Sequence, residues 1–342
     1  MFKNIPYYSK LVLGSSFHQP TFLPNVIRPY FANIEVTENC NAKCITCDYW
    51  KSKKKDTLSY EQFTKIFHSL KNNGINNIRL TGGEALMRKD LFRVLQNFDA
   101  KDFNRVTLAT NGLLLKNNLK SLNDSIITNL TVSLDGLNET NDTIRGVPKY
   151  FQRVTTALLE VNKPIKIVST LTNRLIPQLR EIIDFCKSKG YGFDVNLLDT
   201  NQSFFSSDSV KKTITDLMPN EAELETAFSI LREHKVLSPQ LLKSAGQYLK
   251  TGKYDYHHCM LGFMQIDIDA HANVRTGCQI FDPVGNLLEQ ELDNILTSEK
   301  YRRSVEKMFH FDCPGCTCGY GISALINKPI RGASYYIKRL YS

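Results

Sequence analysis

The fold is decided by the stretch Phe31-Ala-Asn-Ile-Glu-Val-Thr-Glu-Asn-Cys40-Asn-Ala-Lys-Cys44-Ile-Thr-Cys47-Asp-Tyr-Trp50, a short apolar strand that runs into three cysteines. A cuboidal iron–sulfur cluster has four irons, which four thiolates normally hold. Three thiolates in one short loop can hold three irons and leave the fourth open to a small molecule, much as an open position distinguishes catalytic from structural zinc. The spacing therefore indicates a reactive iron–sulfur site at a strand end.

Two other uses of these cysteines are weaker. Zinc sites favour paired cysteines with a second pair or histidines downstream, and residues 48–58 offer neither. A disulfide framework is disfavoured because the chain is long, has nine cysteines, an odd number, and shows no signal peptide. The free thiols and the missing signal predict a cytoplasmic protein. No apolar run reaches membrane-spanning length.

Helical and extended patterns alternate after Trp50, with short connections. Ser59 and Gln62 form a capping box at the start of the first helix, and Gly74 ends it. Repeated strand–helix units imply a parallel sheet with helices outside, and six strands predict an α/β fold with a partial (β/α)6 barrel. We expect helices at 59–73, 90–98, 113–122, 150–162 and 177–189, and further strands at 77–80, 105–109, 130–134, 166–171 and 193–198.

Polar residues follow the expected strands, where such folds place their reactive loops. Gly82 and Gly83 would let the backbone approach a ligand, and Glu84 supplies an acceptor for an ammonium group. The other strand-end candidates are Asn111, Ser133 and Asp135, which can bind hydroxyl or carboxylate groups, and Arg145, which offers a fork to a carboxylate. Each is a common turn residue, but together they predict one ligand pocket.

Residues 30–200 resemble the radical S-adenosylmethionine (SAM) superfamily, in the three-cysteine loop, the Gly82-Gly83-Glu84 run and the Ser133-Leu-Asp-Gly and Arg145-Gly elements. The resemblance implies a [4Fe–4S] cluster on Cys40, Cys44 and Cys47, with SAM chelating the open iron. Tyr49 stands where the family contacts adenine. It also implies reductive SAM cleavage to a 5′-deoxyadenosyl radical that abstracts hydrogen from substrate, and a reductant such as flavodoxin or ferredoxin.

A second cysteine group lies beyond the expected barrel. Cys259 and Cys278 flank a β-hairpin pattern that breaks at 270–273, and a helix expected at 293–309 would return the chain to the same place. This region resembles the Twitch domain, a short relative of the SPASM domain, which implies a second, auxiliary [4Fe–4S] cluster. Its expected ligands are Cys259, Cys278, Cys313 and Cys316, with Cys318 as a substitute. Structural zinc at these four cysteines stays open. Cys186, in an apolar helical stripe, is expected to be buried.

One residue departs from the pattern of sulfatase-maturing relatives. The aspartate that serves them as a base after the second auxiliary cysteine is Gln279 here, which cannot take a proton at neutral pH. Asp267, Asp269 and Asp282 are other carboxylates nearby, although each is expected to be a turn or surface residue. No catalytic residue is assigned.

The chain of 342 residues carries a net charge of +9, part of which lies at 51–55 and in a basic, aromatic tail at 328–342. Peripheral membrane contact through this tail stays open, and a nucleic-acid partner is not expected. We expect four segments: an N-terminal extension (1–30), the radical SAM barrel (31–200), a helical bridge (201–258) with helices near 221–233 and 239–250, and a small hairpin-plus-helix auxiliary domain with the tail (259–342).

The leading functional hypothesis is a radical SAM oxidoreductase that acts on an unactivated C–H bond of a small metabolite, such as a sugar, an aminocyclitol or a lipid-like molecule. A peptide-modifying maturase is the alternative, and residues 1–30 are too short for the recognition domain that some such enzymes carry. A non-catalytic iron–sulfur or zinc scaffold is the third hypothesis. The pocket around Gly82, Gly83, Glu84 and Arg145 argues against a scaffold, which has no use for SAM.

Overall fold

The computed structural model describes residues 28–52, 58–198 and 207–316. Cys318, the basic tail and most of the N-terminal extension lie outside the described residues. A nine-stranded sheet with the order β6-β5-β4-β3-β2-β1-β7-β8-β9 forms the centre. Its strands are β1 (Phe31–Glu35), β2 (Asn77–Thr81), β3 (Arg105–Thr110), β4 (Asn129–Ser133), β5 (Ile165–Leu171), β6 (Gly192–Leu197), β7 (Gln265–Ile268), β8 (Asn273–Arg275) and β9 (Gly285–Asn286).

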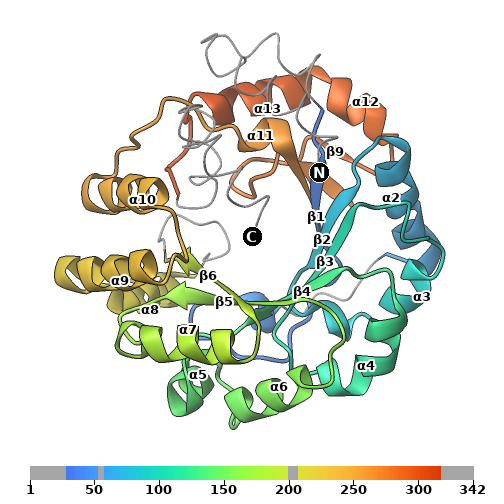
Figure 1. Ribbon diagram of the computed structural model, residues 1–342. Coiled ribbons are helices and arrows are strands. Elements are labelled where there is room, and N and C mark those ends of the chain that lie inside the picture. The colour runs from blue at the N-terminus through green and yellow to red at the C-terminus, as the bar shows by residue number, and fades with distance from the viewer. Residues whose placement is uncertain (1–27, 53–57, 199–206, 317–342) are drawn as a thin grey trace.

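Strands β1 to β6 are parallel, and the helices between them cover the outside of the curved sheet (Figure 1). The expected α/β partial barrel is confirmed. The elements between these strands are η3 (Tyr49–Lys51), α2 (Tyr60–Asn72), η4 (Ala85–Met87), α3 (Leu91–Leu95), α4 (Leu115–Asp124), α5 (Asn138–Arg145), α6 (Tyr150–Leu158), η5 (Ile176–Gln178) and α7 (Leu179–Ser188).

Local chemistry explains the first helix. The Ser59 side chain accepts from the Gln62 backbone, and the Gln62 side chain accepts from the Ser59 backbone, so the predicted capping box forms. Phe63, Ile66, Phe67 and Leu70 make one buried stripe. Cys186, on α7, is also fully buried, as expected.

Strand alternation separates the two faces of the sheet. Ile34, Ile78 and Leu80 are fully buried in the core shared with the helices. Asn33 and Arg79 point to the opposite face, which we call the inner face, and both are partly exposed. Asn33 is in register with Arg79 on β2 and with Asp267 on β7, so these three residues form a row across neighbouring strands. The inner face is therefore polar at this level.

The C-terminal region continues the barrel sheet, because β7 pairs in parallel with β1 while β7, β8 and β9 are antiparallel. The hairpin was expected, but its pairing with β1 was not. The expected single helix at 293–309 breaks at Ser298, which has extended backbone angles and caps the second part. The remaining helices are α8 (Asp208–Leu217), α9 (Glu221–Glu233) and α10 (Pro239–Thr251) of the bridge, then α11 (Leu261–Met264), α12 (Leu292–Thr297) and α13 (Glu299–Phe309).

No helix within the described ranges is long and apolar enough to cross a membrane.

Candidate active site

The three-cysteine loop follows β1 directly, and backbone hydrogen bonds fix it from two sides. Lys43 and Ile45 donate to the carbonyls of Arg145 and Ile144, at 3.1 and 3.0 Å. Gly83 and Glu84 donate to the carbonyls of Thr37 and Asn39, at 2.9 and 2.7 Å. The ends of β2 and α5 therefore position the loop over the carboxyl ends of the strands.

The three thiols are free, partly exposed and close enough to affect one another's ionisation. Burial raises the pKa of Cys47 to about 12, and the charges of Cys44 and Cys40 add to this. Burial also raises the pKa of Cys40. Crowded thiols that resist losing their protons need positive charge beside them to become thiolates, and iron supplies it.

Two polar side chains reach these sulfurs. Asn111 Nδ2 lies 3.9 Å from Cys40 Sγ, and Arg145 Nη1 lies 3.8 Å from Cys44 Sγ. Hydrogen bonds to the sulfurs are among the features that tune an iron–sulfur cluster. The donor set therefore fits a cluster held by Cys40, Cys44 and Cys47.

The paired glycines lie against the backbone of the cysteine loop, while their predicted approach to a ligand stays a prediction. A Cβ on Gly82 would lie 2.2 Å from the Thr37 carbonyl oxygen, and one on Gly83 would lie 2.3 Å from the Asn39 carbonyl oxygen. Gly82 also has a φ of +132°, which side chains rarely adopt. The close approach that requires glycine is thus to the backbone of the cysteine loop.

Replacing Gly83 with alanine should displace this loop and lower its capacity for iron. Overpacking of this kind typically costs about 1–3 kcal/mol. Iron content after anaerobic reconstitution, together with thermal unfolding, measures both effects. Gly192→Ala is the matched control, because its nearest neighbour would lie at 3.6 Å. Equal iron content in the two variants would refute this role of Gly83.

Glu84 is fully engaged by protein donors. Its Oε1 accepts from Thr110 Oγ1 at 2.7 Å and from the Leu86 backbone at 3.1 Å, and its Oε2 accepts from the Asn111 backbone at 2.6 Å. The side chain is 1% exposed, and burial raises its pKa. In this arrangement Glu84 ties the end of β2 to the end of β3, while its binding of an ammonium group stays a prediction.

Asp135 and Arg145 form a buried ion pair, with Oδ2 and Nη2 2.6 Å apart. Asp135 Oδ1 also accepts from the Thr170 backbone at 2.7 Å. Burial alone would lower the pKa of Arg145, but Asp135, Tyr150 and Cys44 together outweigh it and raise that pKa. Arg145 thus links the end of β4 to Cys44.

Ser133 and Asn111 are tied together by Tyr150, whose hydroxyl donates to both of their carbonyls, at 3.1 and 2.5 Å. The predicted residues Glu84, Asn111, Ser133, Asp135 and Arg145 therefore form one connected set around the cysteine loop.

The second cysteine group also converges. Cys278 lies within electrostatic reach of Cys259 and Cys316, and Cys313 within reach of Cys316. Burial raises the pKa of Cys278 to about 12. Cys318 is outside the described residues. Within those residues, no group of three histidine, cysteine or acidic side chains has the geometry of a single metal-ion site.

Aromatic rings hold the Cys316 segment. The Tyr254 hydroxyl donates to the Cys316 carbonyl at 2.8 Å and accepts from its backbone N–H at 2.6 Å. Tyr254 stacks between Tyr248 and Phe311, with ring centroids 4.5 Å away on each side. Tyr248 therefore contributes packing to this segment.

Glu35 is a site residue that the sequence reasoning missed. It ends β1 on the inner face, and its Oε1 accepts from the Tyr49 hydroxyl at 2.5 Å and from Gln279 Nε2. A carboxylate thus stands beside Gln279, although position 279 itself has none. The alternation of Asn33 and Glu35 with buried apolar residues on β1 was the signal that could have revealed it.

Of the three aspartates near Gln279 that were expected in turns or at the surface, Asp267 lies elsewhere. Asp267 is 8% exposed and accepts from Asn33 and Gln265, so its expected position in a turn or at the surface is wrong. Because β7 pairs with β1, this side chain lies on the inner face of the sheet, in register with Asn33. Asp269 does lie in the hairpin turn, where it accepts from His271, Asn273 and Arg275, and Asp282 is exposed.

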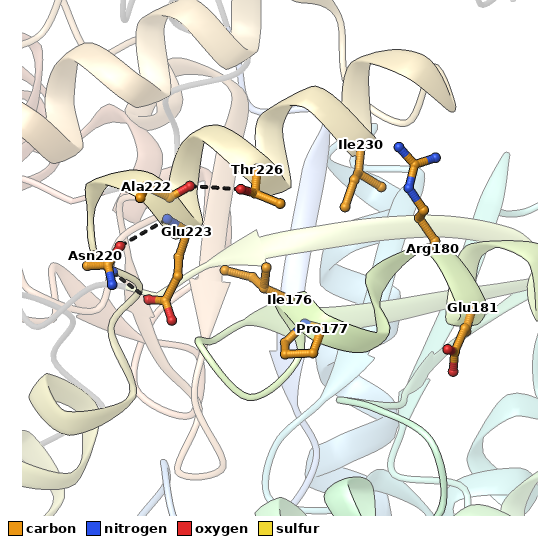
Figure 2. A pocket seen from close by; sticks show the side chains of 9 residues that line it. All are labelled: Ile176, Pro177, Arg180, Glu181, Asn220, Ala222, Glu223, Thr226 and Ile230. Carbon is orange, nitrogen blue, oxygen red and sulfur yellow. Dashed lines mark hydrogen bonds between the residues drawn. The ribbon is translucent and has the colours of Figure 1, made fainter.

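A separate pocket of about 630 Å³ lies between α9 and the segment formed by η5 and the first turn of α7 (Figure 2). Its apolar wall includes Ile176, Pro177 and Ile230, and Arg180 stands at its edge. None of the predicted site residues lines it, so it is distinct from the site at the strand ends.

Comparison with known proteins supports the assignment of this site. Residues 34–187 match the model of the radical SAM superfamily. A GTP 3′,8-cyclase from Aliarcobacter butzleri is 30% identical over 201 residues, which cover 54% of this chain and 60% of the relative. A probable GTP 3′,8-cyclase from Methanococcus vannielii is 25% identical over 233 residues, covering 64% of this chain and 72% of that protein. The match thus spans less than two thirds of the first relative.

Solved structures share the fold. Streptococcus suis SuiB bound to S-adenosylmethionine has a TM-score of 0.60 at 18% identity, over 80% of this chain and 67% of SuiB. The enzyme anSMEcpe, solved with AdoMet and a peptide, has a TM-score of 0.57 at 16% identity, over 84% of this chain and 86% of its own. At such identities the likeness concerns the fold alone.

These comparisons correct the expected substrate. The hypothesis of a sugar, aminocyclitol or lipid-like metabolite is wrong, because the sequence relatives are named for a reaction of GTP. The expected enzyme class is confirmed, and the radical SAM domain implies a [4Fe–4S] cluster and SAM.

Proposed function

The chain contains a radical SAM domain over residues 34–187, and on this premise we propose that it cleaves SAM and applies the resulting radical to a purine nucleoside triphosphate. GTP is the first substrate to test, because the cyclase relatives are named for it. When bound, the cluster and SAM would supply a 5′-deoxyadenosyl radical and release methionine, using one electron from a reductant such as flavodoxin or ferredoxin.

Different residues around the cysteine loop and in the C-terminal region would hold the clusters and SAM. Cys40, Cys44 and Cys47 would ligate three irons, while Asn111 and Arg145 approach two of the sulfurs. Polar groups that flank the loop at Glu84, Ser133 and Asp135 would bind SAM, and Tyr49 would contact its adenine. Cys259, Cys278, Cys313 and Cys316 would hold an auxiliary [4Fe–4S] cluster, as in a Twitch domain, with Cys318 as the substitute ligand.

The observation that carries the substrate class is the position of Arg79. Its side chain projects from β2 onto the inner face, beside Asn33 and Thr107 in register. Within the described residues its guanidinium makes no hydrogen bond or ion pair, and its Nε has neither solvent nor a partner. Burial lowers its pKa, and the charge of Asp267 only partly opposes this.

A guanidinium nitrogen that is closed off from water without a partner is costly, and an arginine fork matches phosphate oxygens in two parallel hydrogen bonds. A bound phosphate would therefore satisfy Arg79. Lys166 projects to the same face from β5, where it lies 3.4 Å from Asp194. Arg275 also shares this face, in register with Asp267, and it pairs with Asp269 at 2.8 Å. Of these three inner-face cations, Arg79 is the one without a carboxylate partner among the described residues, which favours an anionic substrate, and a nucleoside triphosphate agrees with the relatives.

Replacing Arg79 with methionine should weaken GTP binding about 10- to 100-fold, since a hydrogen bond to a charged group contributes about 1.5–3 kcal/mol. Anaerobic equilibrium dialysis with labelled GTP measures this, and guanosine, which lacks phosphate, should bind both proteins alike. Arg105→Met is the control, because Arg105 is exposed at the start of the neighbouring strand. Without ligand, the Arg79 variant should be at least as stable as the wild type.

Two results would contradict the proposal. One is a wild-type protein, loaded with iron, that binds no GTP. The other is equal GTP affinity in the Arg79 and Arg105 variants. A lower stability of the Arg79 variant without ligand would assign this arginine a structural role instead.

A further inference from the structure

Glu35 is hydrogen-bonded to one residue near each of the two cysteine groups. Tyr49, which donates to it, lies two residues after Cys47, and Gln279, its other donor, directly follows Cys278. Both donors reach the same oxygen, Oε1. In the part of the chain that the structure describes, no hydrogen bond reaches Oε2. Glu35 is 9% exposed, so this oxygen is one acceptor on an otherwise enclosed carboxylate.

The neighbouring acidic groups differ from Glu35 in their partners. Asp267 accepts from Asn33 at 2.8 Å and from Gln265 at 2.8 Å. Asp269 pairs with Arg275 at 2.8 Å and caps the hairpin turn. Glu38 accepts from Ser52 at 2.9 Å and lies 3.1 Å from His271. Each of these carboxylates is occupied by protein donors on the elements around it.

Electrostatics also favour a further donor at Glu35. Burial raises its pKa, and the charges of Asp269 and Asp267 raise it further, while Tyr49 and Gln279 oppose them. A carboxylate accepts at about four lone-pair positions, of which Tyr49 and Gln279 use two. Additional N–H donors on Oε2 would stabilise the ionised form.

The position of Glu35 relative to Arg79 indicates which kind of ligand could supply these donors. Glu35 lies two residues beyond Asn33 on β1, and Asn33 is the register partner of Arg79. The two side chains share the inner face, and strand geometry puts their Cα atoms on the order of 8 Å apart. A ligand with an anionic end at Arg79 can therefore present its other end to Glu35.

We propose that Glu35 binds the donor edge of the substrate's purine base, receiving the ring N–H and the exocyclic amino group of guanine on Oε2. The proposal rests on the nucleoside triphosphate function and makes Glu35 its specificity residue. Guanine offers two neighbouring donors, hypoxanthine keeps only the ring N–H, and adenine presents a bare ring nitrogen that a carboxylate repels. Tyr49 and Gln279 would fix the carboxylate in the orientation that makes this selection.

Nucleotide selectivity tests the proposal without catalysis. The wild type, Glu35→Gln and Glu35→Asp are reconstituted anaerobically, and their affinities for GTP, ITP and ATP are measured by competition dialysis. The wild type should prefer GTP to ITP and ITP to ATP. Glu35→Gln should reduce the GTP-to-ATP ratio at least 10-fold, because its amide can turn a donor toward the base, and Glu35→Asp should lie between. Glu38→Gln, another enclosed carboxylate, should keep the wild-type ratio.

The affinity ratio is internal to each sample, so partial loss of folded protein or of iron does not change it. Iron content and the electron paramagnetic resonance spectra of the reduced variants show whether the Tyr49 and Gln279 contacts also support the clusters. A ratio unchanged in whichever Glu35 variant folds would overturn the proposal while leaving the nucleotide function intact. A wild type that binds no GTP would instead overturn the nucleotide function itself.

Discussion

Replacing Cys40, Cys44 and Cys47 together with alanine should remove about four of the roughly eight irons of the reconstituted protein and abolish SAM cleavage. The remaining irons should stay on the second cysteine group, whose residues come from other elements. Iron and sulfide analysis after anaerobic reconstitution gives the loading, and 5′-deoxyadenosine measured by chromatography gives the activity.

Cys186→Ala is the matched control, because this thiol is buried in α7 among apolar residues and touches neither group. It should keep all the iron and full SAM cleavage. If the triple variant retained SAM cleavage, the loop would not be the radical-generating site. If the double variant with alanine at Cys259 and Cys278 kept the full iron content, these cysteines would not hold an auxiliary cluster.

Replacing Arg145 with alanine should lower the free energy of unfolding by about 3–5 kcal/mol, because it leaves the buried Asp135 carboxylate without its counter-charge. It should also weaken SAM binding, since Arg145 connects Asp135 to the Cys44 sulfur. Urea unfolding of the iron-free protein isolates the stability effect from cluster loss.

An exposed pair on the same protein provides the comparison. Arg180 and Glu233 make a 2.6 Å ion pair in which both side chains are about half exposed. Such pairs contribute about 0–1 kcal/mol, so Arg180→Ala should be nearly neutral. Equal losses in the two variants would mean that the Asp135–Arg145 pair has no special part in the fold.

Much of the barrel was predictable because its signals are local. The capping box at Ser59, the stripe on α2 and the alternating apolar strands each depend on residues close in sequence. The carboxyl ends of parallel strands meet at one edge, so the sequence order alone brings Glu84, Asn111 and Asp135 together. The predicted site residues around the cysteine loop therefore form a connected set.

The remainder depends on contacts between distant segments. β7 pairs with β1 although more than 200 residues separate them, and this pairing buries Asp267. Gln279 was interpreted as removing a carboxylate from the site, yet the same pairing brings it to Glu35. Whether Arg79 has a partner likewise depends on the whole inner face, which sequence periodicity does not show.

The most direct test of the central claim is an anaerobic reaction of the reconstituted, chemically reduced wild-type protein with SAM. We expect 5′-deoxyadenosine and methionine in equal amounts, with both products absent from the Cys40/Cys44/Cys47 variant, and consumption of the nucleotide when GTP is present. A fully iron-loaded wild type that forms no 5′-deoxyadenosine, or a triple variant that still forms it, would show that this loop does not generate the radical.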